Sequence, residues 1–314
     1  MIRSETMRLV DLHCDALLKM WRDGSIDFYN DQKLQVSYKQ LKNNNMYLQV
    51  MAIYVPQNIP MSERFLVSLQ MIDLFIEKIV KRFSEVVWVK TKDDFKKITK
   101  EKTGLLLSLE GVEPILDSIT YLKTLYRLGI KSIGITWNKA NLAADGVMEQ
   151  RGGGLTAFGR EIVRTNEKYR IITDVSHLSH KGIYDCLSLT SRLIASHSNV
   201  YDVCQHPRNL QKEAIEWLIE KNGLIGLTFV PTFVSSKKAS LYSLLDHLDY
   251  LLGLGGEKVV SFGSDFDGMD ESMPQLKKID DYDRLLQFLS KYYSDTVLYN
   301  ICEKNAVRFF QEKL

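Results

Sequence analysis

The chain has 314 residues, of which 45% are hydrophobic and 25% charged, and its net charge is +2. This balance is typical of a soluble globular protein with a sizeable core. The absence of a basic block disfavours nucleic acid as a partner. Four scattered cysteines without CxxC spacing predict reduced thiols in a cytoplasmic protein. The N-terminus has no apolar signal region and charges interrupt every long apolar run, so neither a signal peptide nor a membrane span is expected.

Strand-like apolar runs alternate with helix-like stretches along the chain. Apolar residues at 4-3-4-3-4 spacing predict a helix over 62–83. A polar region over 23–45 and a glycine-rich loop over 140–154 carry no predicted element. Strands are predicted near residues 8, 50, 106, 134, 173, 195, 227 and 262, with a short extra strand at 86–89. Further helices are predicted from 13 to about 22, from 91, and over 118–128, 156–169, 179–189, 212–221, 241–252, 280–292 and 295–310.

Leaving the extra strand aside, eight strands are each followed by a helix. The strands are continuous apolar runs, as expected of parallel strands buried on both faces. At this length, eight such units predict an α/β fold, a (β/α)8 TIM-like barrel of the metal-dependent hydrolase type, formed by residues 1–314 as one domain.

Titratable side chains follow five of the predicted strands. They are His13 and Asp15 after the first, Glu110 after the third, His177 after the fifth, His197 after the sixth and Asp265 after the eighth. The carboxyl ends of barrel strands meet at one mouth, where catalytic groups gather. Imidazole and carboxylate suit a borderline divalent cation such as zinc. Such a set can hold two ions with one carboxylate bridging and acidify a water between them, and the remaining carboxylate can carry a proton.

Each residue also has a plain structural explanation. Glu110 before Gly111 can be a cap or loop residue, and the DxDG sequence from Asp265 is more often a turn. His177 and His197 can be satisfied structural imidazoles. The agreement of five strand ends favours the metal site. The other histidines, His180, His206 and His247, are predicted to be structural, and neither a phosphate-binding loop nor a GxSxG elbow is present.

Several longer motifs resemble the membrane dipeptidase (renal dipeptidase) family of zinc peptidases. They cover nearly the whole chain in family order: DLHCD at 11–15, SLEG at 108–111, GITWNKANLAADG at 134–146, GLTAFGREIVRTNEKY at 154–169, DVSHLS at 174–179, SHSNVYDVCQHPRNL at 196–210 and GSDFDG at 263–268. The chain lacks the secretion signal and lipid-anchor tail of animal members, so it resembles a bacterial-type cytoplasmic member.

The resemblance implies a binuclear zinc site with two Zn²⁺ ions. His13 and Asp15 would bind one ion and His177 and His197 the other, with Glu110 as the bridge. Asp265 would shuttle the proton, and Arg208 would hold the substrate carboxylate through its fork of donors. The renal enzymes carry a histidine where this chain has Trp137, which donates one hydrogen bond and cannot titrate. The catalytic residues are therefore expected to be Asp265 and Glu110, and the substrate-binding residues Arg208 and Trp137.

The expected function is zinc-dependent hydrolysis of dipeptides, including those with a C-terminal D-residue, by a metal-bridging hydroxide. The expected partner is a small dipeptide, with no nucleic acid or membrane, and a homodimer is left open. One alternative is a binuclear amidohydrolase acting on another small amide, such as an N-acyl amino acid or a lactam. A second alternative is a barrel retained for binding alone, which the complete set of expected site residues disfavours.

Overall fold

The computed structural model describes residues 7–314. Residues 1–6, part of the N-terminal stretch considered above for a signal peptide, lie outside the described residues. The strands are β1 (Leu9–Asp11), β2 (Met46–Tyr54), β3 (Val86–Trp88), β4 (Thr103–Glu110), β5 (Ile130–Gly134), β6 (Ile172–Asp174), β7 (Leu193–Ala195), β8 (Leu224–Leu227) and β9 (Val260–Phe262).

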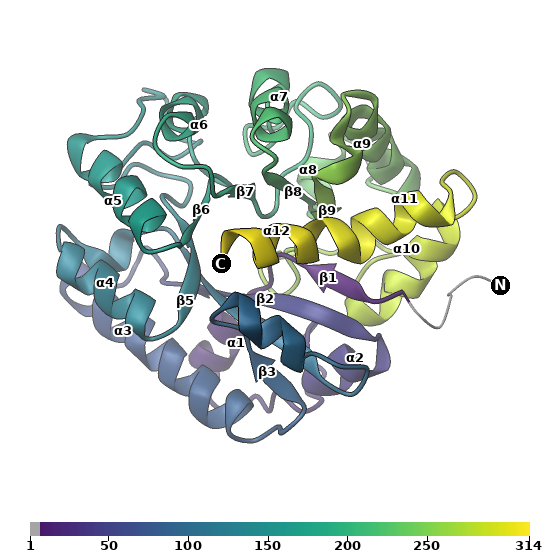
Figure 1. Cartoon of the computed structure of the whole chain (residues 1–314), viewed down its shortest axis with the longest axis horizontal. Coiled ribbons are helices and arrows are strands. Elements are labelled where there is room, and N and C mark those ends of the chain that lie inside the picture. The colour runs from purple at the N-terminus through teal and green to yellow at the C-terminus, as the bar shows by residue number, and fades with distance from the viewer. Residues whose placement is uncertain (1–6) are drawn as a thin grey trace.

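The helices alternate with these strands and surround them (Figure 1). They are α1 (Ala16–Arg22), α2 (Tyr38–Asn43), α3 (Met61–Phe75), α4 (Ile119–Arg127), α5 (Ala157–Lys168), α6 (His180–Leu187), α7 (Lys212–Glu220), α8 (Pro231–Val234), α9 (Leu241–Gly253), α10 (Tyr282–Leu289), α11 (Asp295–Tyr299) and α12 (Asn305–Lys313).

Eight parallel strands close into a barrel. The order runs β2-β1-β9-β8-β7-β6-β5-β4, and pairing between β2 and β4 joins the two ends. β3 lies outside this ring and pairs only with the beginning of β4, from Val86 opposite Thr103 to Trp88 opposite Leu105. The predicted (β/α)8 barrel and its extra strand at 86–89 are therefore confirmed.

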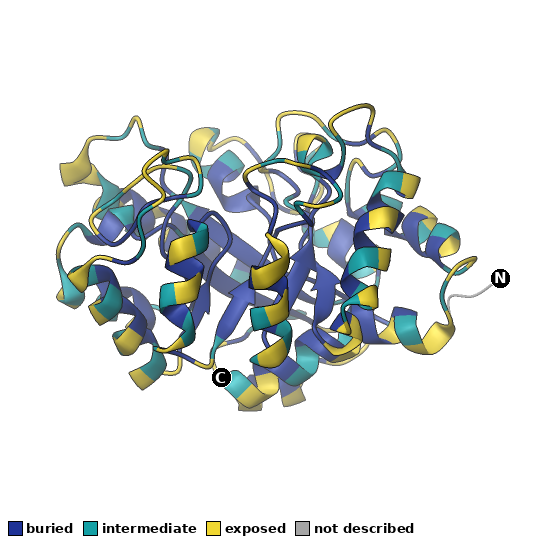
Figure 2. Ribbon diagram, turned by 90° about the horizontal axis from the view of Figure 1, so that it is seen from above, coloured by how far each residue is buried: buried dark blue, intermediate teal, exposed yellow. Residues whose placement is uncertain are grey.

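The barrel interior is apolar and is covered at the amino ends of the strands by α12. Phe309 and Phe310 from this helix join one buried cluster with Val10, Leu48 and Leu224 from the strands. Figure 1 shows α12 lying across the centre of the ring. In Figure 2 the strands are mostly buried, while the helices expose their outer faces. This arrangement leaves the carboxyl ends of the strands as the open mouth.

Two short helices lie in regions for which the sequence predicts no element. α2 lies in the polar region, and its cap is visible in the sequence because the Ser37 hydroxyl accepts from the backbone of Gln40 three residues on. α8 begins at Pro231, a residue suited to the first turn of a helix.

The predicted long helices at 62–83 and 295–310 also differ from the structure. Each contains one π-helical turn, at Ile76–Val80 and at Asn300–Lys304. A π turn inserts one residue and rotates the apolar face, so in α3 Val67 and Met71 are buried where the simple spacing predicts Phe65 and Leu69.

Within residues 7–314 no helix is long and apolar enough to cross a membrane. Over the same residues, 7–314, all four cysteines are buried and none is joined in a disulfide.

Candidate metal centre

The six titratable side chains expected at the mouth are brought together there. Glu110 is the last residue of β4, and the others stand within four residues of the carboxyl ends of β1, β6, β7 and β9. They form two halves: His13, Asp15 and Asp265 beside β1 and β9, and His177 and His197 beside β6 and β7.

Glu110 lies between the halves and offers one oxygen to each. Its Oε2 is 3.6 Å from His13 Nε2. Its Oε1 is 2.8 Å from His177 Nε2 and 3.6 Å from His197 Nε2. One carboxylate thus faces both halves of the cluster.

The β1/β9 half gathers around the His13 ring. His13 Nε2 lies 3.3 Å from Asp15 Oδ2 and 3.7 Å from Asp265 Oδ1. In the other half, His177 Nε2 and His197 Nε2 are 2.8 Å apart. Two groups of three donors can each surround an ion: His13, Glu110 and His197, and His13, Asp15 and Asp265.

Hydrogen bonds at Nδ1 orient the two histidine rings of the β6/β7 half. His177 Nδ1 is 2.7 Å from the Asn138 side-chain oxygen, and His197 Nδ1 is 2.7 Å from Ser196 Oγ. An Nδ1–H that donates to oxygen leaves Nε2 with its lone pair, as metal-binding imidazoles require.

The donor set fits divalent cations. His13 Nε2 and Asp15 Oδ1 are buried without any hydrogen-bond partner. Unpartnered buried polar atoms are rare because each costs about 1–3 kcal/mol. Imidazole nitrogens and carboxylate oxygens that converge in this way are the ligands zinc prefers.

Burial and neighbouring charge shift the pKa values of these groups in opposite directions. Desolvation lowers the pKa of His13, but the negative charges of Glu110 and Asp15 outweigh it and hold that pKa well above its usual value. Desolvation and nearby cationic groups lower the pKa of His177 to about 4 and that of His197 well below its usual range. Burial, together with Asp15 and Glu110, raises the pKa of Asp265. A raised pKa suits a carboxyl group that must accept and release a proton.

The backbone is strained at two of these residues. His177 and Asp265 have φ values of +68° and +65°, in the left-handed region that non-glycine residues avoid. Each such residue costs about 1–3 kcal/mol and is retained where the surroundings hold it in place. Contacts with neighbouring residues therefore hold the backbone at both positions, and the backbone sets the direction of each side chain.

A cavity of about 720 Å³ opens over the metal centre. Asp15, Glu110, His177 and Asp265 line it together with Trp137. The Trp137 ring is 5.2 Å from that of Tyr54, which also lines the cavity. Trp137 therefore lies on the wall of the cavity that contains the candidate metal-binding residues.

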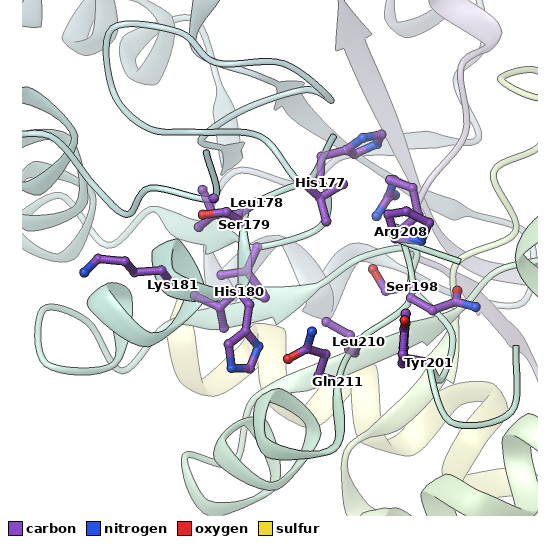
Figure 3. Close-up of a pocket in the computed structure, with 16 residues that line it drawn as sticks. His177, Leu178, Ser179, His180, Lys181, Ser198, Tyr201, Arg208, Leu210 and Gln211 are labelled. Carbon is purple, nitrogen blue, oxygen red and sulfur yellow. The ribbon is translucent and has the colours of Figure 1, made fainter. Parts of the chain in front are cut away.

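Arg208 lines an adjoining cavity of about 290 Å³, which shares His177 with the larger one. In Figure 3, Arg208, Ser198 and Tyr201 lie along one side of it, and His180 and Gln211 lie at the other. The Arg208 guanidinium is buried, donates to the His197 carbonyl at 3.1 Å and stacks on Phe233, which lines the larger cavity. Desolvation lowers its pKa to about 10.

The three remaining histidines lie outside the cluster, as predicted. His247 Nδ1 accepts from the backbone of Val200, and its Nε2 donates to the Val234 carbonyl. Burial lowers the pKa of His247 to about 4, so it is a neutral, fully bonded structural residue.

Sequence reasoning missed the residues that support the metal-facing side chains. Asn138 and Ser196 orient two rings, and Asp11 and Asp174 are buried carboxylates just before the histidines of β1 and β6. One signal for the aspartates is present: both DLHCD and DVSH carry an Asp two or three residues ahead of the histidine.

An apolar parallel barrel with a cluster of imidazole and carboxylate side chains at its carboxyl mouth is a (β/α)8 barrel of the metal-dependent hydrolase type. Residues 3–313 match the model of the membrane dipeptidase family, peptidase family M19. The chain belongs to this family.

Individual relatives are distant in sequence. An uncharacterized dipeptidase of Schizosaccharomyces pombe is 28% identical over 229 residues, which cover 70% of this chain and 55% of the relative. The dipeptidase tcpJ of Claviceps purpurea is 28% identical over 253 residues, covering 78% and 59%. The chain thus spans less than two thirds of the length of either relative.

The fold is shared with solved structures over its whole length. A metallo peptidase from Rhodobacter sphaeroides, solved with a phosphinate mimic of the dipeptide L-Ala-D-Ala, superimposes with a TM-score of 0.91 at 23% identity. The match covers 99% of this chain and 100% of that one.

Proposed function

We propose that this chain is a zinc-dependent dipeptidase, a single metallo-dipeptidase domain that hydrolyses dipeptides, including those with a C-terminal D-residue. The main observation behind the proposal is the orientation of the Glu110 carboxylate. One of its oxygens faces His13, and the other faces His177 and His197. A bridging carboxylate between two histidine-bearing halves is the arrangement a binuclear hydrolase needs. The family membership and the dipeptide mimic bound by the Rhodobacter sphaeroides relative support this substrate class.

His13 and Asp15 would hold one zinc ion, His177 and His197 the other, and Glu110 both. When bound, the two ions would supply an acidified water as nucleophile and polarise the scissile carbonyl. Asp265 would take the proton of that nucleophile and deliver it to the departing amine. Its raised pKa and its position 3.7 Å from His13 Nε2 suit this role.

Arg208 would bind the carboxylate of the substrate. The unpartnered Nε of its buried guanidinium supports this role, because a buried charge is stabilised by an anion that pairs with it. Trp137 would contact the substrate through its ring area and its single N–H. Binding at Arg208 would restrict the enzyme to short substrates, because a further residue would occupy the space beside the guanidinium.

Four buried cysteines that form no disulfide in the described part of the chain support a cytoplasmic location. A homodimer stays a prediction, which sedimentation of the purified protein tests.

Metal content and turnover, measured together, test the function. Purified protein should hold about two zinc ions per chain and hydrolyse a panel of dipeptides that includes C-terminal D-residues. N-acyl amino acids and lactams serve as the comparison substrates. Faster turnover of those amides than of any dipeptide would favour the amidohydrolase alternative, and full activity after chelation would contradict the mechanism.

A further inference from the structure

Two buried aspartates beneath the metal centre have no place in the ligand set. Asp11 is 0% exposed and Asp174 is 7% exposed. No lysine or arginine forms an ion pair with either in the part of the chain that the structure describes. Burying an unpaired carboxylate is costly, and desolvation raises the pKa of both groups. Their hydrogen bonds must account for their presence.

Asp11 joins the two strands of the first half. Its Oδ1 accepts from the backbone N–H of His13 at 3.2 Å and from that of Ser264 at 3.0 Å. Its Oδ2 accepts from the Tyr282 hydroxyl at 2.9 Å. One carboxylate thereby ties the backbone of a metal-facing histidine to the residue just before Asp265.

Asp174 repeats this arrangement in the second half. Its Oδ1 accepts from the backbone N–H of Ser176 and of Ser196, each at 3.0 Å. These two serines immediately precede His177 and His197. The same oxygen therefore holds the backbone leading into both histidines of the β6/β7 half.

The strand pairings β1–β9 and β6–β7 explain why side-chain hydrogen bonds are useful at these points. The β1–β9 pairing contains only Asp11 opposite Phe262, and the β6–β7 pairing ends with Asp174 opposite Ile194. Beyond these pairs the regular ladder stops and single backbone bonds join the segments, among them Asp265 N–H to the His13 carbonyl and Val175 N–H to the Ile194 carbonyl. The backbone turns to positive φ at Asp265 and at His177. The aspartates add side-chain hydrogen bonds between segments that no longer form a regular ladder.

We propose that Asp11 and Asp174 are positioning residues, each of which holds the ligands of one metal ion. Asp11 serves the ion of His13 and Asp15, and Asp174 serves the ion of His177 and His197. This inference rests on the proposed binuclear centre. It predicts that the two aspartates act on different ions, whereas a merely structural role would change stability without selecting between them.

Zinc affinity, measured site by site, tests the inference. Asp11→Ala and Asp174→Ala should each weaken one of the two zinc ions about 10- to 100-fold, the usual effect of losing a group that orients a ligand. Chelator-competition titration gives the two dissociation constants. Crystals grown with one zinc per chain locate the retained ion by anomalous scattering. It should lie at His177 and His197 in Asp11→Ala, and at His13 and Asp15 in Asp174→Ala.

Asp11→Asn and Asp174→Asn provide the conservative pair. The asparagine oxygen can still accept both backbone N–H groups without the charge, so each variant should show a smaller loss confined to the same ion. If an alanine variant fails to fold, the zinc affinities of the two asparagine variants test the inference instead. Asn305→Ala is the control, because Asn305 is equally buried and donates to two backbone carbonyls, Glu257 and Val260, at the other end of β9. It should lower stability and leave both dissociation constants unchanged.

Folded variants that weaken both ions equally, or neither, would overturn the inference. These results remain distinct from failure of the proposed function, which would appear in the unmodified protein as fewer than two zinc ions or no turnover of dipeptides.

Discussion

The two ends of the barrel differ in chemical character, since the amino end is apolar and the carboxyl end carries buried polar groups. At the amino end, α12 covers the strands with Phe309 and Phe310, and these side chains are fully packed among apolar neighbours. At the carboxyl end, His13 Nε2 and Asp15 Oδ1 are buried without a hydrogen-bond partner, and His177 and Asp265 have positive φ.

This difference separates stability from chemistry. Burial of a large apolar side chain stabilises the fold by about 1.5–3 kcal/mol, whereas each unpartnered polar atom or strained residue at the mouth costs a similar amount. The closed, apolar end therefore supplies the free energy that allows the open end to hold reactive groups in unfavourable surroundings. Substitutions at the two ends should have separable effects.

The largest effect is expected from Asp265, at the carboxyl end. Asp265→Asn removes the proton carrier, so kcat should fall about 10²- to 10⁴-fold while zinc content stays near two. Glu110→Gln should lose zinc as well, because Glu110 faces both halves. Steady-state kinetics and metal analysis on the same samples check both results. Loss of both ions from Asp265→Asn would show that the two roles are assigned wrongly.

A substitution at the amino end should lower stability and leave zinc content and catalysis unchanged. Phe310→Ala leaves a cavity beneath the barrel, and the free energy of unfolding should fall by about 3–5 kcal/mol. The folded variant should keep its zinc content and kcat. Denaturant unfolding gives the first quantity, and a fall in zinc affinity of the folded variant would mean that the two ends are coupled.

Arg208→Met tests the smaller cavity, which Arg208 lines. Removing one partner of a buried charge-assisted pair costs about 2–5 kcal/mol, so kcat/KM for dipeptides should fall about 30-fold or more. Poor substrates with an amidated C-terminus should be spared because they present no carboxylate. An equal loss for both kinds of substrate would remove Arg208 from substrate binding.

His247 is a structural histidine outside the candidate metal centre, and its effect on stability can be tested separately. Its pKa is near 4 in the folded protein and near 6.5 when unfolded, so its stabilising effect is present above pH 6.5 and is lost as the pH falls toward 4. The shift corresponds to about 3 kcal/mol. His247→Gln cannot titrate, so the stability difference between wild type and variant should shrink over this window. Because both proteins share the metal centre, a difference that is independent of pH would contradict the role of His247.

The smallest effect is expected at Trp137, on the wall of the larger cavity. Trp137→His restores the residue of the renal enzymes, and it should change the ranking of C-terminal residues, D against L included, at wild-type zinc content. Competition between paired dipeptides measures this ranking. An unaltered ranking would mean that Trp137 only packs against Tyr54.

The sequence by itself determined the barrel and which side chains lie at its carboxyl mouth. Continuous apolar runs require burial on both faces, and eight of them with intervening helices leave few other parallel folds. A residue just after such a strand must lie at the carboxyl mouth, so placing Glu110 or His197 there needed no tertiary information. The identity of the ions and the role of each ligand stay predictions.

Only the tertiary structure decided how those side chains are held. The Glu110 oxygens divide between two halves because β2 and β5 set the position of β4 in the closed ring. Asp11 reaches Ser264 across 253 residues of chain, and Asp174 reaches Ser196 only because β6 and β7 are neighbours. Local patterns report which face of a strand is buried and where a strand ends. Contacts between distant strands depend on register and closure, which belong to the barrel as a whole.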